Sequence, residues 1–189
     1  MTGFAELLKK RRAIRDFQEK EVPLDLVMEI IRESTFAPSS GNGQPWRFVI
    51  VKDRAWIKRI SDESKRNLVS YLEKDPGSPL KKYEAALRNE GYNVFYNAPC
   101  LVFIVGPKTL PTLQVDCALA ACYFMFSAVA RGLGTCWVAL GSHITDPDTL
   151  KALGLSEGQR IVAPIILGYP KLIPAVPPRN DPQVLNIIE

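Results

Sequence analysis

The spacing of apolar residues along the chain predicts helices first and strands mixed with helices later. Apolar positions in residues 4–14 recur with the period of a helix, and Pro23 precedes a second helix that has one apolar and one charged face. This second helix should end near Phe36, because Pro38 restricts the residue before it. Further helices are predicted over 54–73, 80–89, 113–130 and 146–153, and strands over 47–51, 101–105, 135–140 and 161–167. This order favours an α+β fold with a central sheet over a regular βαβ alternation.

Two apolar stretches predict buried elements. Residues 101–105 show no polar alternation, so the strand there should be covered on both faces. Residues 117–130 form the longest apolar run, 14 residues between Asp116 and Arg131. A membrane span needs about 20 apolar residues, so this run predicts a helix buried in protein, and no membrane contact is expected.

The C-terminal residues 170–189 are expected to form an extended arm. Five of the chain's 15 prolines fall in residues 170–182, which excludes a helix there. The arm nevertheless ends in the apolar residues 184–188, which need a protein surface to cover them. A partner subunit is the expected surface.

Length and composition indicate one domain over residues 1–189. Apolar residues make up 47% of the chain and charged residues 23%, which excludes disordered and fibrous classes. The single histidine, His143, argues against a histidine-rich metal site. Four cysteines without a C-x-x-C pair indicate buried thiols in a reducing compartment, and no signal peptide is visible. A cytoplasmic protein is expected.

The net charge of +4 is confined to the N-terminal segment. Residues 1–15 carry five basic side chains and one acidic side chain, and the rest of the chain is neutral. Arg11, Arg12 and Arg15 can converge on one anion, and their forked donors suit a phosphate. A solvated helix end, a short nucleic-acid patch or a nuclear localisation run would show the same composition. A nucleic-acid partner is not expected, because no wider basic surface accompanies the cluster.

Residues 37–48 combine hydroxyl, amide and glycine residues between two prolines and lead directly into a predicted strand. The glycines allow the backbone to come close to a ligand. A plain loop needs turn residues, but it does not need two serines, an asparagine and a glutamine together. A binding loop and a plain loop both stay open for this segment.

Residues 132–141 carry three glycines but do not form a dinucleotide-binding motif. That motif needs G-x-G-x-x-G after a strand and at the start of a helix, whereas these glycines follow a helix and open a strand. A helix stop with a core strand, or a strand edge that faces a flat apolar ligand, both explain the pattern. Taken alone, Cys136 indicates a buried thiol, and His143 and Arg179 indicate surface positions.

Together these motifs resemble the FMN-dependent nitroreductase family. The matching segments span almost the whole chain in the family's order, and residues 38–46 are the most specific of them. The matches are R-R-x-I-R-x-F at 11–17, P-S-x-x-N-x-Q-P-W-x-F at 38–48, N-A-P at 97–99, G-L-G-T-C-W at 132–137, L-G-Y-P at 167–170, and Arg179.

The resemblance implies an α+β sandwich around a mostly antiparallel sheet and an intertwined homodimer with two FMN sites at its interface. The helix over 113–130 would lie in that interface, and the arm over 170–189 would embrace the other subunit. These two implications account for the apolar run and for the apolar end of the arm.

The resemblance also implies which residues hold FMN. Arg11, Arg12 and Arg179 would bind the phosphate and the ribityl chain, and Arg15 would reach N1 and O2 of the flavin. The partner subunit would supply Pro38, Ser39, Ser40 and Asn42, and backbone donors along the ring would come from Trp137, Val138, Ala139 and Leu140. Two residues depart from the family pattern: Ala13 stands where serine is frequent, and Ala139 stands where some relatives carry an acidic residue.

The implied activity is transfer of hydride from NAD(P)H, through flavin N5, to a small-molecule acceptor such as a nitroaromatic compound or a quinone. One shared site would serve both substrates in turn, and no side chain is needed as a nucleophile because the cofactor supplies the chemistry. Flavin fragmentation, reductive dehalogenation, reduction of enones or metal chelates, and non-catalytic FMN binding are the alternatives. Residues 64–92 are a candidate lid.

Overall fold

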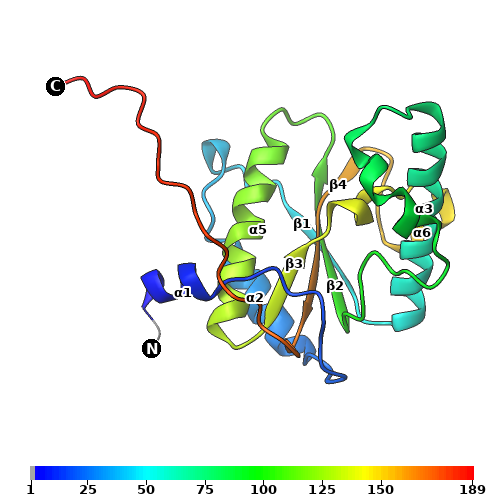
Figure 1. The fold of residues 1–189 in the computed structure, drawn as a ribbon, viewed down its shortest axis with the longest axis horizontal. Coiled ribbons are helices and arrows are strands. Elements are labelled where there is room, and N and C mark those ends of the chain that lie inside the picture. Colours follow the sequence, from blue (N-terminus) through cyan, green and yellow to red (C-terminus); the bar gives the residue numbers. More distant parts are fainter. Residues whose placement is uncertain (1–2) are drawn as a thin grey trace.

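The computed structural model describes residues 3–189 and contains a four-stranded sheet with helices on both faces (Figure 1). The strand order is β1-β2-β4-β3, and all three strand pairs are antiparallel. The strands are β1 (Arg47–Val51), β2 (Cys100–Pro107), β3 (Gly134–Trp137) and β4 (Gln159–Gly168). The predicted α+β fold with an antiparallel central sheet is confirmed.

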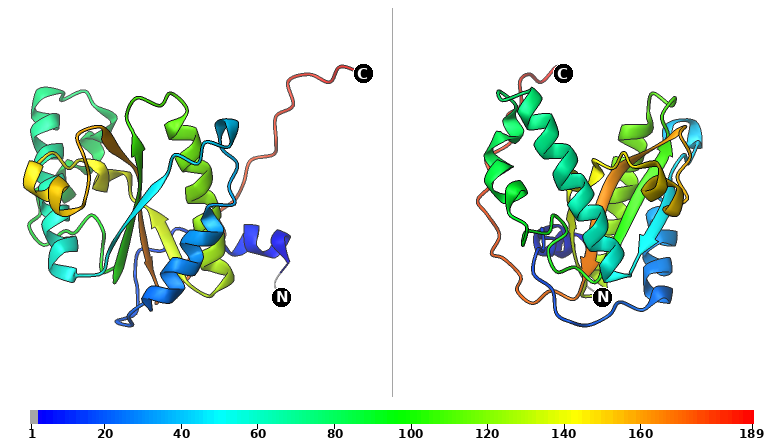
Figure 2. Two further views of the ribbon diagram at one scale, coloured as in Figure 1. Left: turned by 180° about the vertical axis from the view of Figure 1, so that it is seen from behind. Right: turned by 90° about the vertical axis from the view of Figure 1, so that its right-hand side faces the viewer.

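The helices divide between the two faces of the sheet, with α2 and α5 on one face and α3, α4 and α6 on the other (Figures 1 and 2). Short 3-10 turns at Ser40–Asn42, Pro79–Tyr83 and Ala139–Ser142 complete the described structure. The helices are α1 (Phe4–Lys10), α2 (Leu24–Ser34), α3 (Arg54–Lys74), α4 (Glu84–Arg88), α5 (Leu113–Ala130) and α6 (Pro147–Ala152).

Strand β2 lies between two separate apolar cores, as its sequence predicts. Its even-numbered residues, such as Val102, pack with α2 and α5, and its odd-numbered residues, such as Phe103, pack with α3. Both of these side chains are fully buried. Alternate residues of a strand point to opposite faces, so a strand covered on both sides needs apolar residues throughout.

Helix α5 has the predicted bounds and crosses one face of the sheet. It is the one helix among residues 3–189 with the length and hydropathy of a membrane span, but it packs against α2 and the sheet as a core helix does. Val115, Leu119 and Tyr123 form an exposed stripe along it at helical spacing. The helix is followed by Gly132 with a φ of 74°, which is consistent with the helix stop considered for residues 132–141.

The helix predicted over 80–89 is a 3-10 turn at Pro79–Tyr83 followed by α4, and the predicted bounds of β2, β4 and α6 differ from the observed ones by one or two residues at each end. Two further predicted elements end earlier than expected. Helix α1 ends at Lys10, so Ile14 is not on it; instead the Ile14 N–H donates to the Thr135 oxygen at 2.9 Å. The strand predicted over 135–140 ends at Trp137, because the chain turns there and packs against α3, where Ser64 Oγ donates to the Leu140 oxygen. In both cases a tertiary contact, and not the local pattern of apolar residues, determines where the element ends.

The C-terminal arm is extended, as predicted, and leaves the body of the protein (Figure 1). All residues from 171 to 189 are exposed, and Leu185 is 97% exposed. Its contact with a partner subunit stays a prediction.

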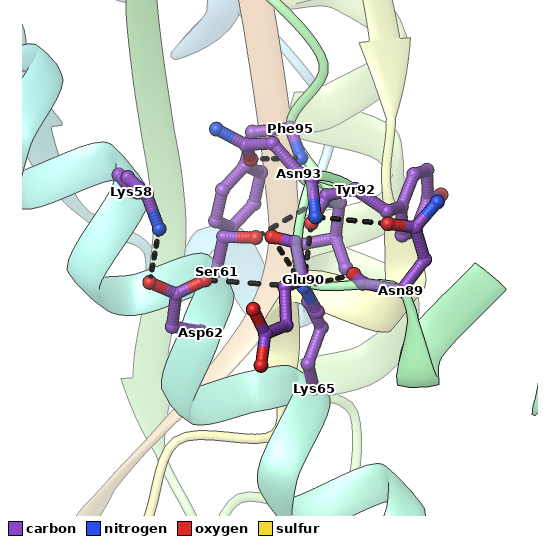
Figure 3. Close-up of polar contacts among 11 residues, drawn as sticks. Lys58, Ser61, Asp62, Lys65, Asn89, Glu90, Tyr92, Asn93 and Phe95 are labelled. Atoms are coloured by element: carbon purple, nitrogen blue, oxygen red, sulfur yellow. Dashed lines mark hydrogen bonds and ion pairs between the residues drawn. The ribbon is translucent and has the colours of Figure 1, made fainter.

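The segment before β2 is fixed to α3 by one buried lysine (Figure 3). The side chain of Lys65 is only 8% exposed, and its Nζ donates to the carbonyl oxygens of Asn89 and Tyr92, each at 2.7 Å. One turn earlier on α3, Ser61 Oγ accepts from the Val94 N–H at 2.9 Å. A buried ammonium is tolerated only when such acceptors replace water. These bonds therefore place the segment that carries Tyr92.

We expect Lys65→Met to lower the free energy of unfolding by about 2 kcal/mol, because the charge-assisted hydrogen bonds of a buried ammonium are lost. Lys58 on the same helix is the matched control, since its side chain is 64% exposed and pairs with Asp62 at 2.6 Å. Lys58→Met should cost less than about 0.5 kcal/mol. Urea denaturation measures both, and equal costs would show that Lys65 does not fix the segment.

Candidate functional site

The basic segment of residues 11–15 lies along the outer edge of β3. Ala13 and Thr135 form a parallel bridge, and Ile14 is buried beside it. Gly134 makes this approach possible, because a Cβ there would lie 2.6 Å from Cγ1 of Ile14. Part of the glycine pattern thus serves packing between the N-terminal segment and the sheet.

The extended backbone of this segment distributes its arginines over two sides. Arg11 and Arg15 both act on the Cys136 thiol, where their charges oppose the pKa rise that burial causes. Arg12 lies instead in a groove with Lys9 and Lys10. The alternation follows from the two-residue period of extended chain. Arg11 and Arg15 therefore share a face, and Arg12 belongs to the other side.

A cavity of about 510 Å³ opens at the end of β3, and we call it the β3 cavity. Its wall unites Arg15 with the stretch 136–140, so five residues proposed from the sequence lie together there. Those five are Arg15, Trp137, Val138, Ala139 and Leu140.

A second wall of the β3 cavity comes from residues 79–96, of which 79–92 were named only as part of a candidate lid and Tyr96 was not named. This wall is aromatic and basic, and the rings of Tyr92 and Tyr96 meet edge to face at 6.2 Å. The residues that sequence reasoning missed are Pro79, Leu80, Lys82, Tyr83, Tyr92 and Tyr96. The only signal that could have found them is the concentration of tyrosines before the N-A-P motif.

The titratable groups of the β3 cavity are cationic or neutral. Burial raises the pKa of Tyr92 to about 12, with Tyr96 adding to the rise and Arg15 opposing it. Burial also raises the pKa of the Cys136 thiol, so the interpretation of Cys136 as an unreactive buried thiol holds. Because Arg15 and Lys82 both line the cavity, it favours an electron-rich or anionic guest.

Two buried polar atoms beside the bridge have no hydrogen-bond partner within residues 3–189. They are Nε of Arg12 and Oγ1 of Thr135. Buried polar groups almost always have a partner, so each has capacity left for a ligand or for water. On the other side of the segment, the guanidinium groups of Arg11 and Arg15 suit the phosphate and the electron-rich ring of a phosphorylated planar cofactor.

The loop that contains Pro38, Ser39, Ser40 and Asn42 lies at the other end of α5. The Ser40 N–H donates to Asp116 Oδ1 at 3.0 Å, near the start of that helix. Arg12 lies beside Val129 and Ala130, near its end. At 1.5 Å per residue the two positions are roughly 20 Å apart along the helix. Within one protomer, the loop and the basic segment therefore do not meet.

Some polar groups of this loop serve the loop itself. Ser39 Oγ accepts from the Gln44 N–H at 3.0 Å, and Asn42 Oδ1 accepts from Gln44 Nε2 at 3.2 Å. The side chains of Pro38, Ser40 and Asn42 are exposed. The hydrogen bonds within the turn thus account for Gln44, and the exposed side chains of Pro38, Ser40 and Asn42 can still reach another molecule.

The remaining motif residues have distinct positions. Asn97 of the N-A-P motif holds the N-terminal segment, since its Oδ1 accepts from the Phe17 N–H and its Nδ2 donates to the Phe17 oxygen, both at 3.0 Å. Arg179 is exposed on the arm and lines none of the described cavities. His143 is half-buried, and burial lowers its pKa.

Comparison with known proteins identifies the family. The chain is 28% identical over 183 residues to iodotyrosine deiodinase of Thermotoga neapolitana, covering 93% of both chains. It is 30% identical over 182 residues to 5,6-dimethylbenzimidazole synthase of Rhodospirillum rubrum, covering 89% of this chain and 82% of that protein.

Solved structures agree. A nitroreductase of Bacteroides fragilis with bound FMN superposes with a TM-score of 0.81 at 24% identity over the whole of both chains. An iodotyrosine deiodinase bound to FMN and 3-iodo-L-tyrosine superposes with a TM-score of 0.75 at 26% identity, covering 97% of this chain and 99% of that one. The cofactor expected from the sequence is thus the one bound in both of these structures. Residues 8–169 match the model of the nitroreductase family, and this chain therefore belongs to that family.

Proposed function

We propose that this protein is an FMN-dependent oxidoreductase that takes electrons from NAD(P)H and passes them to a nitroaromatic, quinone or similar small acceptor. The observation that carries the proposal is the β3 cavity, which Arg15 lines together with the stretch 136–140. Both were expected to border the flavin ring, although Trp137 lies 122 residues after Arg15 in the chain. The FMN in the solved relatives supports the same assignment.

Arg15 and Arg11 have separate roles in this proposal. Bound FMN would accept hydride at N5 and release the electrons to the second substrate. Arg15 would hold its guanidinium at the pyrimidine edge and stabilise negative charge there, in the way preorganised cations do. Arg11, on the same face of the segment, would bind the phosphate. The backbone of 137–140 would orient the ring.

The functional unit in this proposal is a homodimer. One protomer holds the basic segment and the loop 38–42 at opposite ends of α5, so a second copy is needed to bring a loop to each cavity. The exposed stripe of Val115, Leu119 and Tyr123 and the uncovered apolar residues of the arm supply surface for that contact. Pro38, Ser39, Ser40, Asn42 and Arg179 would then act on the partner's cofactor.

NAD(P)H acts in the proposal as a transient substrate. The glycines at 132 and 134 follow α5 and open β3, so they do not build a dinucleotide-binding turn. The nicotinamide and the acceptor would use the β3 cavity one after the other, which is ping-pong chemistry.

Reductive dehalogenation is the second candidate, and the match to iodotyrosine deiodinases favours it. In that reaction two electrons and a proton replace a carbon–iodine bond with a carbon–hydrogen bond and release iodide. The same cavity would hold the iodinated ring.

The double variant Arg11→Ala/Arg179→Ala should bind FMN about 100-fold or more weakly, since each lost charge-assisted hydrogen bond contributes about 1.5–3 kcal/mol. Flavin fluorescence titration of the apoprotein measures the affinity. The control is Arg32→Ala/Arg66→Ala, which removes two exposed arginines from α2 and α3 and should leave affinity unchanged. A folded, colourless, monomeric wild-type protein, or unchanged affinity in the first variant, would refute the proposal.

Arg15→Gln should lower the midpoint potential of the bound flavin by about 30 mV, the equivalent of about 1.4 kcal/mol for two electrons. The reduced form gains a negative charge, and the variant no longer offers a cation to it. An equilibrium dye titration gives the potential, with Arg66→Gln as the control. An unchanged potential in Arg15→Gln would place this guanidinium away from the flavin.

Anaerobic mixing with NADH or NADPH should bleach the flavin absorbance, and a nitroaromatic compound or a quinone added afterwards should restore it. Lines of constant slope in double-reciprocal plots would confirm the shared site. Rapid iodide release from 3-iodotyrosine with poor nitro reduction would favour dehalogenation instead. Bound FMN that no nicotinamide reduces would indicate a non-catalytic flavin-binding protein.

A further inference from the structure

The wall of the β3 cavity that comes from residues 79–96 has a composition that the proposed flavin site does not require. Tyr83, Tyr92 and Tyr96 come from one segment, and Lys82 lies among them. Aromatic faces and edges favour another flat ring. A cation in such a wall adds a preference for charge on that ring.

No carboxylate lines this cavity within the described residues 3–189. The nearest acidic neighbour in sequence, Glu84, is engaged elsewhere, with Lys81 Nζ at 2.5 Å and Arg88 at 3.0 Å. Tyr92 stays a neutral phenol because burial raises its pKa to about 12. The guest therefore meets positive charge and neutral rings.

Two adjacent lysines differ in their partners. Lys81 forms an ion pair with Glu84 and does not line the cavity. Lys82 lines the cavity, and its Nζ lies 5.1 Å from the centre of the Tyr83 ring. Among the described residues, Lys82 has no carboxylate within 4 Å. Its charge is held at the aromatic wall and is available to a ligand.

We infer that the electron acceptor is a planar aromatic anion, whose ring lies against Tyr83, Tyr92 and Tyr96 and whose carboxylate or phenolate pairs with Lys82. The inference rests on the proposed function and specifies the acceptor of that site. Arg15 is already committed to the flavin edge in that proposal, so Lys82 is the specificity-determining cation. The pyrophosphate of NAD(P)H is the competing occupant for this lysine.

Two acceptors of equal shape test the inference: 4-nitrobenzoate, which is an anion, and 4-nitrobenzamide, which is neutral. In Lys82→Gln, kcat/KM for 4-nitrobenzoate should fall about fivefold, the effect of losing one partly exposed ion pair. The value for 4-nitrobenzamide and the rate of flavin reduction by NAD(P)H should not change. The intrinsic reactivity of each compound does not affect the result, because kcat/KM of the variant is divided by that of the wild type for the same compound.

Lys81→Gln is the matched control and should leave both acceptors unaffected. Binding is measured separately, by titrating the oxidised holoenzyme with benzoate and benzamide and following its visible spectrum. Wild-type protein should bind benzoate more tightly, and Lys82→Gln should lose that preference.

Equal losses for both acceptors, or a change confined to the NAD(P)H half-reaction, would overturn the inference and leave the proposed function standing. Wild-type protein that binds no FMN, or reduces neither compound, would instead refute the proposed function. The inference names the electron acceptor of that site, so it fails together with the proposed function in that case.

Discussion

The candidate site depends on the contact that holds the N-terminal segment against the edge of β3. The hydrogen bond from the Ile14 N–H to Thr135, and a second one from the Gln18 N–H to Tyr169, extend the sheet edge with chain from the N-terminus. The absence of a Cβ at Gly134 leaves room for the Ile14 side chain. Without this contact with the sheet edge, the arginines would stay at the end of the exposed helix α1. With it, Arg15 reaches the far end of the strand and borders a cavity.

Helix α5 imposes the second constraint, which is one of distance. Its apolar inner face is held by the sheet and α2, so it is a rigid spacer between the loop 38–42 and the segment 11–15. Both segments have the chemistry of ligand binding, yet one copy of the chain keeps them apart. In the proposed dimer, a second copy that packs on the exposed stripe of α5 and on the arm would bring its loop 38–42 to the segment 11–15 of the first copy.

Sequence reasoning succeeded where a local pattern decides the structure. The bounds of β1 and α5 follow from β-branched and apolar runs with clear stops, and Asp146 caps α6 as its side chain predicts. It failed where distant residues decide. The turn after Trp137 is set by packing on α3, and the segment that carries Tyr92 is held by Lys65, which lies 27 residues earlier in the chain. Neither contact produces a periodic pattern of apolar residues in the sequence, so neither could be predicted from it. The resemblance to a family identified Arg15 and residues 137–140 as candidate site residues. The cavity residues from 79–96 became apparent only from the fold.

The bonds made by Lys65 have a consequence for how this scaffold diversifies. Its partners are main-chain oxygens of Asn89, Glu90 and Tyr92, so the anchorage is indifferent to which side chains those positions carry. Side chains that face the ligand can be substituted without loss of the hydrogen bonds that Lys65 makes to the backbone. Substitutions at residues 89–92 can therefore change which ligand the cavity selects while the hydrogen bonds from Lys65 keep the position of the backbone.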